Sequence, residues 1–495
     1  MTLGRFGLRK NVSRRDALKL LTVGAAGITA ESLVPGSFGP SSDQSREIDV
    51  VIVGAGFAGL VAARNLLRAG KRVVLLEARD RVGGRVKGGE LAGHLVDVGG
   101  MWLGPTQTRL LALINEYGFH TTPQFDKGKI IVDLNGKRVY AEADRTGLDS
   151  AAQAEYDRVV GELSRLSAQV PLDAPWTMPQ AEQFDTITVE QWLESQTKNR
   201  DFMAFLQLCT RTQFTAEPFQ MSLLYFLFYL RSGDSFDVQL GYDANSAQAF
   251  RVKETMHQLA VRVSKEIEKA IVLEAPVTEI SQDENGVTAK SAKGEWRGNY
   301  AIVAVPLPLS VRISYRPALP PQRDILAQHM PMGSVIKCLF AYDKPFWRAR
   351  GLSGITTSDA PPSAGFFDIS PADSEIGILG AFIEAHNAIN WTGRPMQERK
   401  KLMVDRIVSF FGPEAANPID YEDQDWPSEI WSRGCYGATM APGMMTTAAK
   451  TIRQPFGRIH WAGTETSPRW MGYIDGAIRS GERVADEVRT LLNRK

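Results

Sequence analysis

A glycine-rich turn near the start of the chain constrains its fold more than any other feature. Residues 48–53 form a short apolar run rich in β-branched side chains, which is typical of a buried parallel strand. Gly54, Gly56 and Gly59 follow it, and residues 57–69 have the pattern of a helix. The first glycine permits a tight turn, the second lets the backbone approach a pyrophosphate, and the third lets the helix pack on the strand. The pattern predicts a strand–turn–helix unit whose helix N-terminus binds the phosphates of a dinucleotide.

The next strand adds an acidic residue at the position that such a site needs. Residues 72–77 are again apolar and end at Glu77, about where a carboxylate grips a ribose hydroxyl. Arg79, Gly84 and Arg85 lie just beyond it. An ordinary βαβ unit with a glycine turn, followed by a solvated basic loop, would share part of this pattern. The order of strand, helix, strand and acid favours dinucleotide binding.

Composition excludes some classes of function. The chain has 495 residues, 43% of them hydrophobic, and a formal net charge of +1. This length allows two or three domains with a large core. Because there is no global excess of charge, we expect neither nucleic acid nor an anionic membrane as a partner. We expect no metal site, and the cysteines, Cys209, Cys338 and Cys435, are too few to indicate a disulfide framework.

The first 45 residues have the layout of an export signal and a linker. Basic residues precede the uncharged run 20–30, which is too short to span a membrane, and a stretch rich in Pro, Gly and Ser follows. Arg14 and Arg15 stand in a sequence that resembles a bacterial twin-arginine signal. That resemblance implies export of the folded protein to the periplasm and a mature chain without a membrane span. A disordered basic tail on a cytoplasmic protein is the alternative.

Longer helical patterns appear after the predicted dinucleotide-binding segment, at 180–197 and 202–230. The mostly apolar run 221–230 is too short for a transmembrane helix and predicts a buried one. Further on, the strand-like run 332–342 is apolar on both faces and has Lys337 at its centre. A buried, unpaired ammonium is costly, so such a lysine loses its charge or finds a partner. A lysine that snorkels or ends the strand is the alternative.

The final seventy residues hold the most specific motifs. They contain, in order, Trp426, the run 431–436 with Cys435 and Tyr436, the strand-like run 458–463, Glu465, and the run 470–476 with Tyr473 and Ile474. A helix beginning near Gly472 would direct its positive N-terminus at a group on which negative charge develops. Core packing is the alternative for both tyrosines, and an unlinked thiol is the alternative for the cysteine.

Together these segments resemble the flavin-containing monoamine oxidases, over about 46–495 and only weakly across 140–200 and 350–420. The resemblance implies an α/β fold with a Rossmann-like FAD-binding domain of the glutathione-reductase and monoamine-oxidase type. An α+β substrate-binding domain is interleaved with it. The implied FAD-binding domain comprises 46–126, 245–310 and 426–495, and the implied substrate-binding domain comprises 127–244 and 311–425, after the signal and linker at 1–45.

The resemblance also implies the residues that bind FAD. Cys435 stands where the family has the cysteine that bonds to the flavin 8α carbon, and Val277 stands where the backbone contacts the adenine end. Lys337 stands where the family's lysine holds a water beside flavin N5. The implied cofactor contacts are Gly54, Gly56, Ala58, Gly59, Glu77, Arg79, Gly84, Arg85, Gly100, Met101, Trp102, Val277, Trp426, Cys435, Gly463, Glu465 and Ile474.

The implied substrate site is an apolar cavity in which Tyr436 and Tyr473 hold an amine. Tyrosine faces attract an amine and can orient its lone pair. Phe214 and Gln248 stand where the family lines this cavity, although an exposed loop glutamine is an equal alternative for the second. We expect Lys337 and the two tyrosines to be the catalytic residues.

The implied reaction is the oxidation of a primary or secondary amine. The α-carbon gives a hydride to flavin N5, and the imine is hydrolysed to an aldehyde or ketone with release of ammonia or a smaller amine. O2 then takes the electrons and gives H2O2. Exported bacterial members that oxidise pseudooxynicotine in nicotine degradation are similar in length and signal, which makes that amine one candidate substrate.

Other functions remain open at this point. An L-amino-acid oxidase would need a cavity arginine, for which Arg211, Arg231 and Arg251 are candidates. A polyamine oxidase would need cavity acids. A flavin dehydrogenase would pass its electrons to a periplasmic redox carrier instead of O2, and a flavin-binding protein could lack amine chemistry altogether. A homodimer is one expected assembly.

Overall fold

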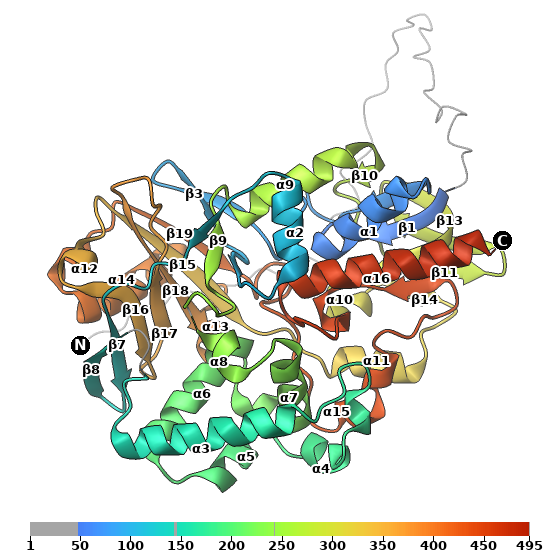
Figure 1. Cartoon of the computed structure of the whole chain (residues 1–495). Helices are drawn as coiled ribbons and strands as arrows, with labels where there is room; N and C mark the ends of the chain where they lie inside the picture. Colours follow the sequence, from blue (N-terminus) through green and yellow to red (C-terminus); the bar gives the residue numbers. More distant parts are fainter. Residues whose placement is uncertain (1–47, 143–145, 242, 495) are drawn as a thin grey trace, which may run out of the picture. The chain divides into compact units, whose positions relative to one another are not determined.

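The computed structural model describes residues 48–142, 146–241 and 243–494 (Figure 1). The predicted signal and linker at 1–45 lie outside the described residues. Of the helices in these ranges, none combines the length and the apolar character that crossing a membrane requires.

The glycine-rich turn belongs to a large sheet that has eight strands within the described ranges. Strand β1 (Ile48–Val53) pairs in parallel with β2 (Val73–Leu76) on one side and β13 (Gly294–Val303) on the other. The strand order is β10-β2-β1-β13-β12-β11-β14, with β20 paired to β13. The other strands are β10 (Ile271–Val272), β11 (Glu279–Asp283), β12 (Gly286–Ser291), β14 (Ser314–Arg316) and β20 (Ile459–Trp461). The parallel pairs and the helix that joins β1 to β2 confirm the Rossmann-like α/β prediction.

Two helices pack against this sheet and against each other. Helix α1 (Phe57–Arg68) follows the glycine-rich turn, and α16 (Ile474–Asn493) lies beside it in Figure 1. A Cβ added to Gly481 would lie 2.4 Å from the carbonyl oxygen of Ala58, so this glycine allows the two helices to approach closely. The two segments of the expected FAD-binding domain that are farthest apart in the sequence therefore meet directly.

A second sheet has the strand order β17-β18-β15-β19. Its central strands, β15 (Val335–Tyr342) and β18 (Gly377–Glu384), are antiparallel and buried at every residue. The outer strands are β17 (Ser363–Asp368) and β19 (Asp420–Asp425). Strands buried on both faces read as continuous apolar runs, which explains the sequence around Lys337.

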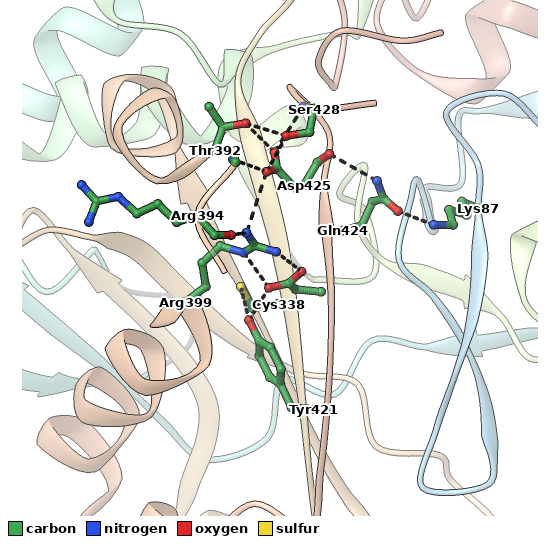
Figure 2. A network of polar contacts seen from close by, with 11 residues as sticks. Lys87, Cys338, Thr392, Arg394, Arg399, Tyr421, Gln424, Asp425 and Ser428 are labelled. Carbon is green, nitrogen blue, oxygen red and sulfur yellow. Dashed lines mark hydrogen bonds and ion pairs between the residues drawn. The ribbon is translucent and has the colours of Figure 1, made fainter. Parts of the chain in front are cut away.

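The edge strand β19 is acidic, and a polar network satisfies its side chains (Figure 2). Arg399 donates to both carboxylate oxygens of Asp423, at 2.8 and 2.7 Å, and the hydroxyl of Tyr421 donates to the same group at 2.7 Å. Asp425 accepts hydrogen bonds from Thr392 and Ser428, and Lys87 donates to Gln424. Charged side chains on an edge strand also discourage pairing with another chain.

Residues 150–240 are mostly helical. The predicted helix at 180–197 is two helices, α4 (Ala181–Thr186) and α5 (Val189–Gln196), because Thr188 forms a capping box with Gln191. The predicted helix at 202–230 is also two, α6 (Arg200–Phe214) and α7 (Leu223–Ser232). Thr215 adopts a left-handed conformation after α6, and Ser222 caps α7. Both predicted helices were too long for the same reason, because local caps interrupt a continuous apolar pattern.

The remaining elements complete the fold. The longer ones are α2 (Thr108–Glu116), α3 (Ser150–Ser167), α8 (Phe236–Leu240), α9 (Met256–Glu266), α11 (Pro321–Gln328), α13 (Ala385–Trp391), α14 (Met396–Phe411), β7 (Lys129–Leu134), β8 (Lys137–Ala141) and β16 (Leu352–Ser358). The short ones are β3 (Gly88–Leu91), β4 (His94–Asp97), β5 (Trp102–Leu103), β6 (Thr121–Pro123), β9 (Phe250–Val252), α10 (Leu307–Ser310), α12 (Phe346–Ala349) and α15 (Met444–Thr447). Because β14 pairs with β11 in the large sheet, the expected boundary at 310 falls short of that sheet's last strand.

Candidate active site

A cavity of about 570 Å3 is lined by residues from both sheets. Its size lies in the range of sites for cofactors and small ligands. The predicted site residues that line it are Gly54, Gly56, Ala58, Glu77, Arg79, Gly84, Arg85, Gly100, Met101, Trp102, Gln248, Val277, Lys337, Trp426, Cys435, Tyr436, Gly463, Tyr473 and Ile474. Gly59, Phe214 and Glu465 were predicted as contacts and are not among the lining residues.

The glycine-rich turn forms one end of the cavity. Gly54 has a φ of 101°, which favours glycine, and a Cβ added to Gly56 would meet no atom within 4 Å. No side chain caps the N-terminus of α1, so its first amides are open to an anionic group. Gly59 supports the turn by packing instead, because a Cβ there would lie 1.9 Å from the carbonyl oxygen of Gly54.

Glu77 lies at the end of β2, next to this turn. Its carboxylate accepts hydrogen bonds from the backbone amides of Ala55, at 2.7 Å, and Arg79, at 3.0 Å. The side chain of Arg79 in turn donates to the hydroxyl of Ser432 at 2.8 Å. The carboxylate is thus held in place and retains lone pairs for a ribose hydroxyl.

Arg85, which lines the cavity, forms a largely buried ion pair with Glu465. Arg85 donates to Glu465 at 2.6 Å and to the backbone carbonyl of Tyr436 at 2.8 Å. Burial alone would raise the pKa of Glu465, but the charge and hydrogen bonds of Arg85 outweigh it, and the pKa is lowered. Glu465 therefore acts on the site through Arg85, which fixes the segment that carries Tyr436.

Lys337 is buried in β15, with only 2% of its surface exposed. Its ammonium donates to the backbone carbonyls of Asp97, at 2.7 Å, and Gly99, at 3.0 Å, and lies 2.8 Å from the sulfur of Met101. Burial lowers the pKa of Lys337, and the nearby charge of Asp97 opposes that shift. The lysine has found partners in the cavity wall, and its Nζ lies 5.6 Å from the ring of Trp102.

Tyr436 and Tyr473, the two tyrosines expected to hold the amine, come from segments that touch. A Cβ added to Gly437, which follows Tyr436, would lie 3.6 Å from the Cα of Gly472, which precedes Tyr473. The ring of Tyr436 lies 5.7 Å from that of Phe382. The ring of Tyr473 lies 4.9 Å from that of Trp470. Both phenol rings therefore belong to aromatic clusters that restrict their motion.

The lining residues that were missed from the sequence include Thr212, Gln213, Tyr229 and Phe382. Gln213 donates to the hydroxyls of Tyr473, at 2.8 Å, and Tyr229, at 3.0 Å, and so orients both tyrosine side chains. Phe214, which was predicted to contact substrate, packs behind this layer with its ring 4.5 Å from that of Tyr229. The available signal was the polar pair Thr212 and Gln213, directly before Phe214, which the resemblance placed in the substrate cavity.

Cys435 places a buried thiol in the cavity wall. Its carbonyl accepts a hydrogen bond from Thr215 at 2.5 Å, and its amide donates to Gly333 at 2.9 Å. A Cβ added to Gly333 would lie within 2.7 Å of atoms in Phe214, Thr215 and Cys435, so this glycine lets three segments meet. Burial raises the pKa of the Cys435 thiol to about 12.

The charges in the cavity wall are unevenly placed. Among the described lining residues, Glu77 is the only carboxylate, and the arginines are Arg79, Arg85, Arg312 and Arg433. The three arginines considered as partners for a substrate carboxylate, Arg211, Arg231 and Arg251, do not line it. Arg211 is paired with Glu217 at 2.7 Å, and Arg251 donates to the carbonyl of Ile369 at 3.0 Å.

The lining fits the cofactor that the sequence predicted. Open helix amides and Gly56, whose added Cβ would meet no atom, suit a pyrophosphate. A fixed carboxylate suits a ribose, and α16 begins at the cavity with Ile474. An electron-accepting ring next to Lys337 and the N-terminus of α16 would lie among groups that favour negative charge.

Comparisons with known proteins show the family of this chain. Residues 57–489 match the family described as flavin containing amine oxidoreductase. A probable flavin-containing monoamine oxidase A of Dictyostelium discoideum is 38% identical over 451 residues, which cover 90% of this chain and 99% of that protein. An L-amino acid dehydrogenase of Synechocystis sp. is 35% identical, with 90% of this chain and 96% of that protein covered.

Solved structures give the same result. Putrescine oxidase bound to putrescine superimposes with a TM-score of 0.86 and 31% identity, over 90% of this chain and 99% of that one. Cyclohexylamine oxidase from Brevibacterium oxydans has a TM-score of 0.86 and 30% identity, over 90% of this chain and 100% of that one. The chain belongs to the flavin-containing amine oxidoreductases, which are FAD-dependent enzymes that oxidise amines.

Proposed function

We propose that this protein oxidises a primary or secondary amine whose remaining part is uncharged. The observation that carries the proposal is the composition of the cavity wall around the tyrosines. This amine end is lined by Thr212, Gln213, Tyr229, Gln239, Leu240, Gln248, Val335, Phe382, Tyr436 and Tyr473. These described residues include no carboxylate for a second ammonium and no guanidinium for a substrate carboxylate.

Four residues of the amine end have proposed roles. Tyr436 and Tyr473 bind the amine between their rings and orient its lone pair. Gln213 holds the hydroxyl of Tyr473 at 2.8 Å, and Gln248, fixed by a 2.9 Å bond to the carbonyl of Gln239, closes the wall beside it. None of these lining residues carries a charge that would pair with an ammonium, and burial disfavours the charged form, so the amine is bound in its neutral form.

Further residues hold the cofactor in this proposal. FAD, when bound, accepts the hydride from the α-carbon of the amine and passes the electrons to O2. The α1 turn binds its pyrophosphate, Glu77 its ribose and Val277 its adenine end, while Cys435 provides a covalent link. Lys337 holds a water against the cavity wall near Met101 and Trp102.

Several finer features belong to the same proposal. The imine product is hydrolysed to an aldehyde or ketone, and O2 yields H2O2. The protein is exported by the twin-arginine route to the periplasm and assembles as a homodimer. Pseudooxynicotine remains a candidate substrate, because it is a secondary amine whose other end is an uncharged pyridyl ketone.

Anaerobic flavin bleaching tests the proposed function. The panel contains 3-phenylpropylamine, its N-methyl derivative, an L-amino acid with the same aromatic group and a linear diamine. We expect rapid bleaching of the flavin absorbance by the first two and at least tenfold slower bleaching by the others. Faster bleaching by the amino acid or the diamine would contradict the proposed substrate class, and no bleaching by any of them would contradict amine oxidation.

A further inference from the structure

One face of the β15–β18 sheet forms part of the amine end of the cavity. Lys337 of β15 lies opposite Phe382 of β18, and Val335 lies opposite Glu384. Directly opposed residues of an antiparallel pair share a face of the sheet, and side chains two positions apart on one strand share it too. Since Val335, Lys337 and Phe382 line the cavity, Glu384 faces the same side.

Glu384 is a buried carboxyl with an unused oxygen. Only 3% of its surface is exposed, and its Oε1 atom has no hydrogen-bond partner among the described residues. Its Oε2 atom accepts a hydrogen bond from the hydroxyl of Thr212, at 3.2 Å. Thr212 lines the cavity, so it connects the carboxyl to the substrate space.

The charged groups around Glu384 do not neutralise it. Arg211 of α6 is committed to Glu217, with 2.7 Å between them. His386, on the helix that begins after Glu384, is hydrogen-bonded to the same Glu217. Val335, opposite Glu384 on β15, is apolar. The nearest cation therefore has its own anion, and Glu384 is left with the hydroxyl of Thr212.

We propose that Thr212 and Glu384 form a second polar subsite, which binds an uncharged hydrogen-bond acceptor, such as a ring nitrogen or a ketone, at the far end of the substrate. The inference rests on the proposed amine oxidation and specifies its substrate class further. Glu384 is a positioning residue that acts through Thr212. Two residues along a strand span about 7 Å, so the acceptor lies several bonds from the reacting nitrogen.

A count of protons supports an acceptor rather than an ammonium as the bound group. Burial raises the pKa of Glu384 to about 8, so the carboxyl is protonated at neutral pH. A neutral carboxyl and a hydroxyl hold two acidic protons, and their mutual hydrogen bond uses one. In the neutral state the carboxyl can donate to the hydroxyl oxygen of Thr212, and the Thr212 proton is then left as the one donor for the substrate. When the carboxyl ionises, the remaining proton is used within the pair and no donor is left.

The test uses a matched pair of substrates on the flavin-loaded enzyme. These are 3-phenylpropylamine and 3-(pyridin-3-yl)propylamine, which differ by a ring nitrogen and have similar amine basicities. We expect kcat/KM to be about tenfold higher for the pyridyl amine at pH 7, as one well-placed hydrogen bond allows. The ratio of the two values cancels effects on the chemistry that both substrates share.

Three variants and a control locate the effect. Thr212→Val should reduce the ratio about tenfold because it removes the hydroxyl. Glu384→Gln should preserve the ratio, because its amide still supplies a spare donor, and Thr212→Ser should restore it. Thr210→Val is the matched control, since the hydroxyl of Thr210 bonds to Leu206 within α6 and does not line the cavity.

The pH dependence separates this subsite from a merely structural role. A carboxyl is protonated below its pKa, so the wild-type ratio should be high at pH 7 and fall as the pH rises through about 8. In Glu384→Gln the ratio should not change over this range, because the amide does not titrate. Flavin absorbance and thermal melting establish that each variant is folded and loaded.

Three results would overturn the inference. They are equal kcat/KM values for the two amines in the wild type, an unchanged ratio in Thr212→Val, or a clear preference for a linear diamine, which would mean that an ionised Glu384 binds an ammonium. If the phenyl amine itself fails to reduce the flavin, the proposed function fails instead, so the two failures are distinguishable.

Discussion

At the scale of single residues, Lys337 combines deep burial with an ammonium group. Backbone carbonyls of Asp97 and Gly99 hold it at 2.7 and 3.0 Å, which compensates for part of the lost hydration. A structural lysine at this position would gain little over a methionine, because the strand is buried throughout. The geometry favours a role in the reaction, since the side chain lines the cavity.

We expect Lys337→Met to fold and bind FAD but to turn over about a hundredfold more slowly, which corresponds to about 3 kcal/mol. Reoxidation by O2 should suffer most, because a positive or polar group beside the flavin favours electron transfer to oxygen. Stopped-flow absorbance of both half-reactions measures the effect. Lys87→Met is the control, since Lys87 contacts Gln424 outside the cavity lining. Wild-type rates in both half-reactions would refute the role.

Cys435 provides a second prediction at this scale. Its thiol lines the cavity, whereas Cys209 and Cys338 are buried thiols elsewhere. If Cys435 is linked to FAD, acid precipitation of the wild type leaves a yellow pellet. Cys435→Ser should release the colour to the supernatant, while Cys209→Ser and Cys338→Ser should keep it in the pellet. Colour in the wild-type supernatant would show that the cofactor is not covalently bound.

At the scale of elements, the contact between α1 and α16 links the two ends of the cofactor site. Both helices begin at the cavity, α1 after the glycine-rich turn and α16 after Tyr473. Their close approach depends on Gly481, whose added Cβ would lie 2.4 Å from the carbonyl oxygen of Ala58. A change in this contact would move both helix N-termini relative to each other.

Gly481→Ala should therefore destabilise the protein by about 1–3 kcal/mol, as overpacking does, and lower its flavin content. Gly161→Ala is the matched control, because Gly161 lies in α3 and a Cβ there would meet no atom within 4 Å. In the control, the higher helix propensity of alanine should raise stability by up to about 1 kcal/mol. Thermal melting and flavin absorbance test both variants, and equal melting temperatures would contradict the argument.

The sequence predicted some elements closely and others poorly. The apolar run 48–53 is β1, and the expected helix at 57–69 is α1, because one pattern defines each of them. The patterns at 180–197 and 202–230 joined pairs of helices, because an apolar surface continues across caps that only local geometry reveals. Thr212 and Glu384 were missed because they lie 172 positions apart, and no local pattern shows that α6 covers the end of β18.

At the scale of the whole molecule, the cavity depends on nearly the entire described chain. Its lining begins at Val53 and ends at Ala477, with contributions from both sheets and from α6. An unfolded chain therefore cannot present this site to FAD. If the protein is exported with its cofactor, the export system has to carry it already folded, which agrees with the twin-arginine signal expected from the sequence.

Replacement of Arg14 and Arg15 by lysine tests this expectation. We expect the variant to remain in the cytoplasm with normal flavin content and activity, while the wild type appears in the periplasm. Cell fractionation followed by flavin fluorescence and an amine oxidation assay measures both pools. The exchange of Lys19 for arginine keeps the charge of the segment and serves as the control. An unchanged periplasmic pool in the double variant would refute this route.

The pairing of β15 with β18 makes the protein a scaffold whose selectivity can be redesigned. Val335 and Glu384 lie two residues along their strands from Lys337 and Phe382, while the turn and the acid predicted to bind the phosphates and ribose belong to the other sheet. Substitutions at Val335 and Glu384 can therefore alter which amines are accepted without disturbing cofactor binding. Directed evolution for new amine substrates should begin with positions 212, 335 and 384 varied together, since they share one surface.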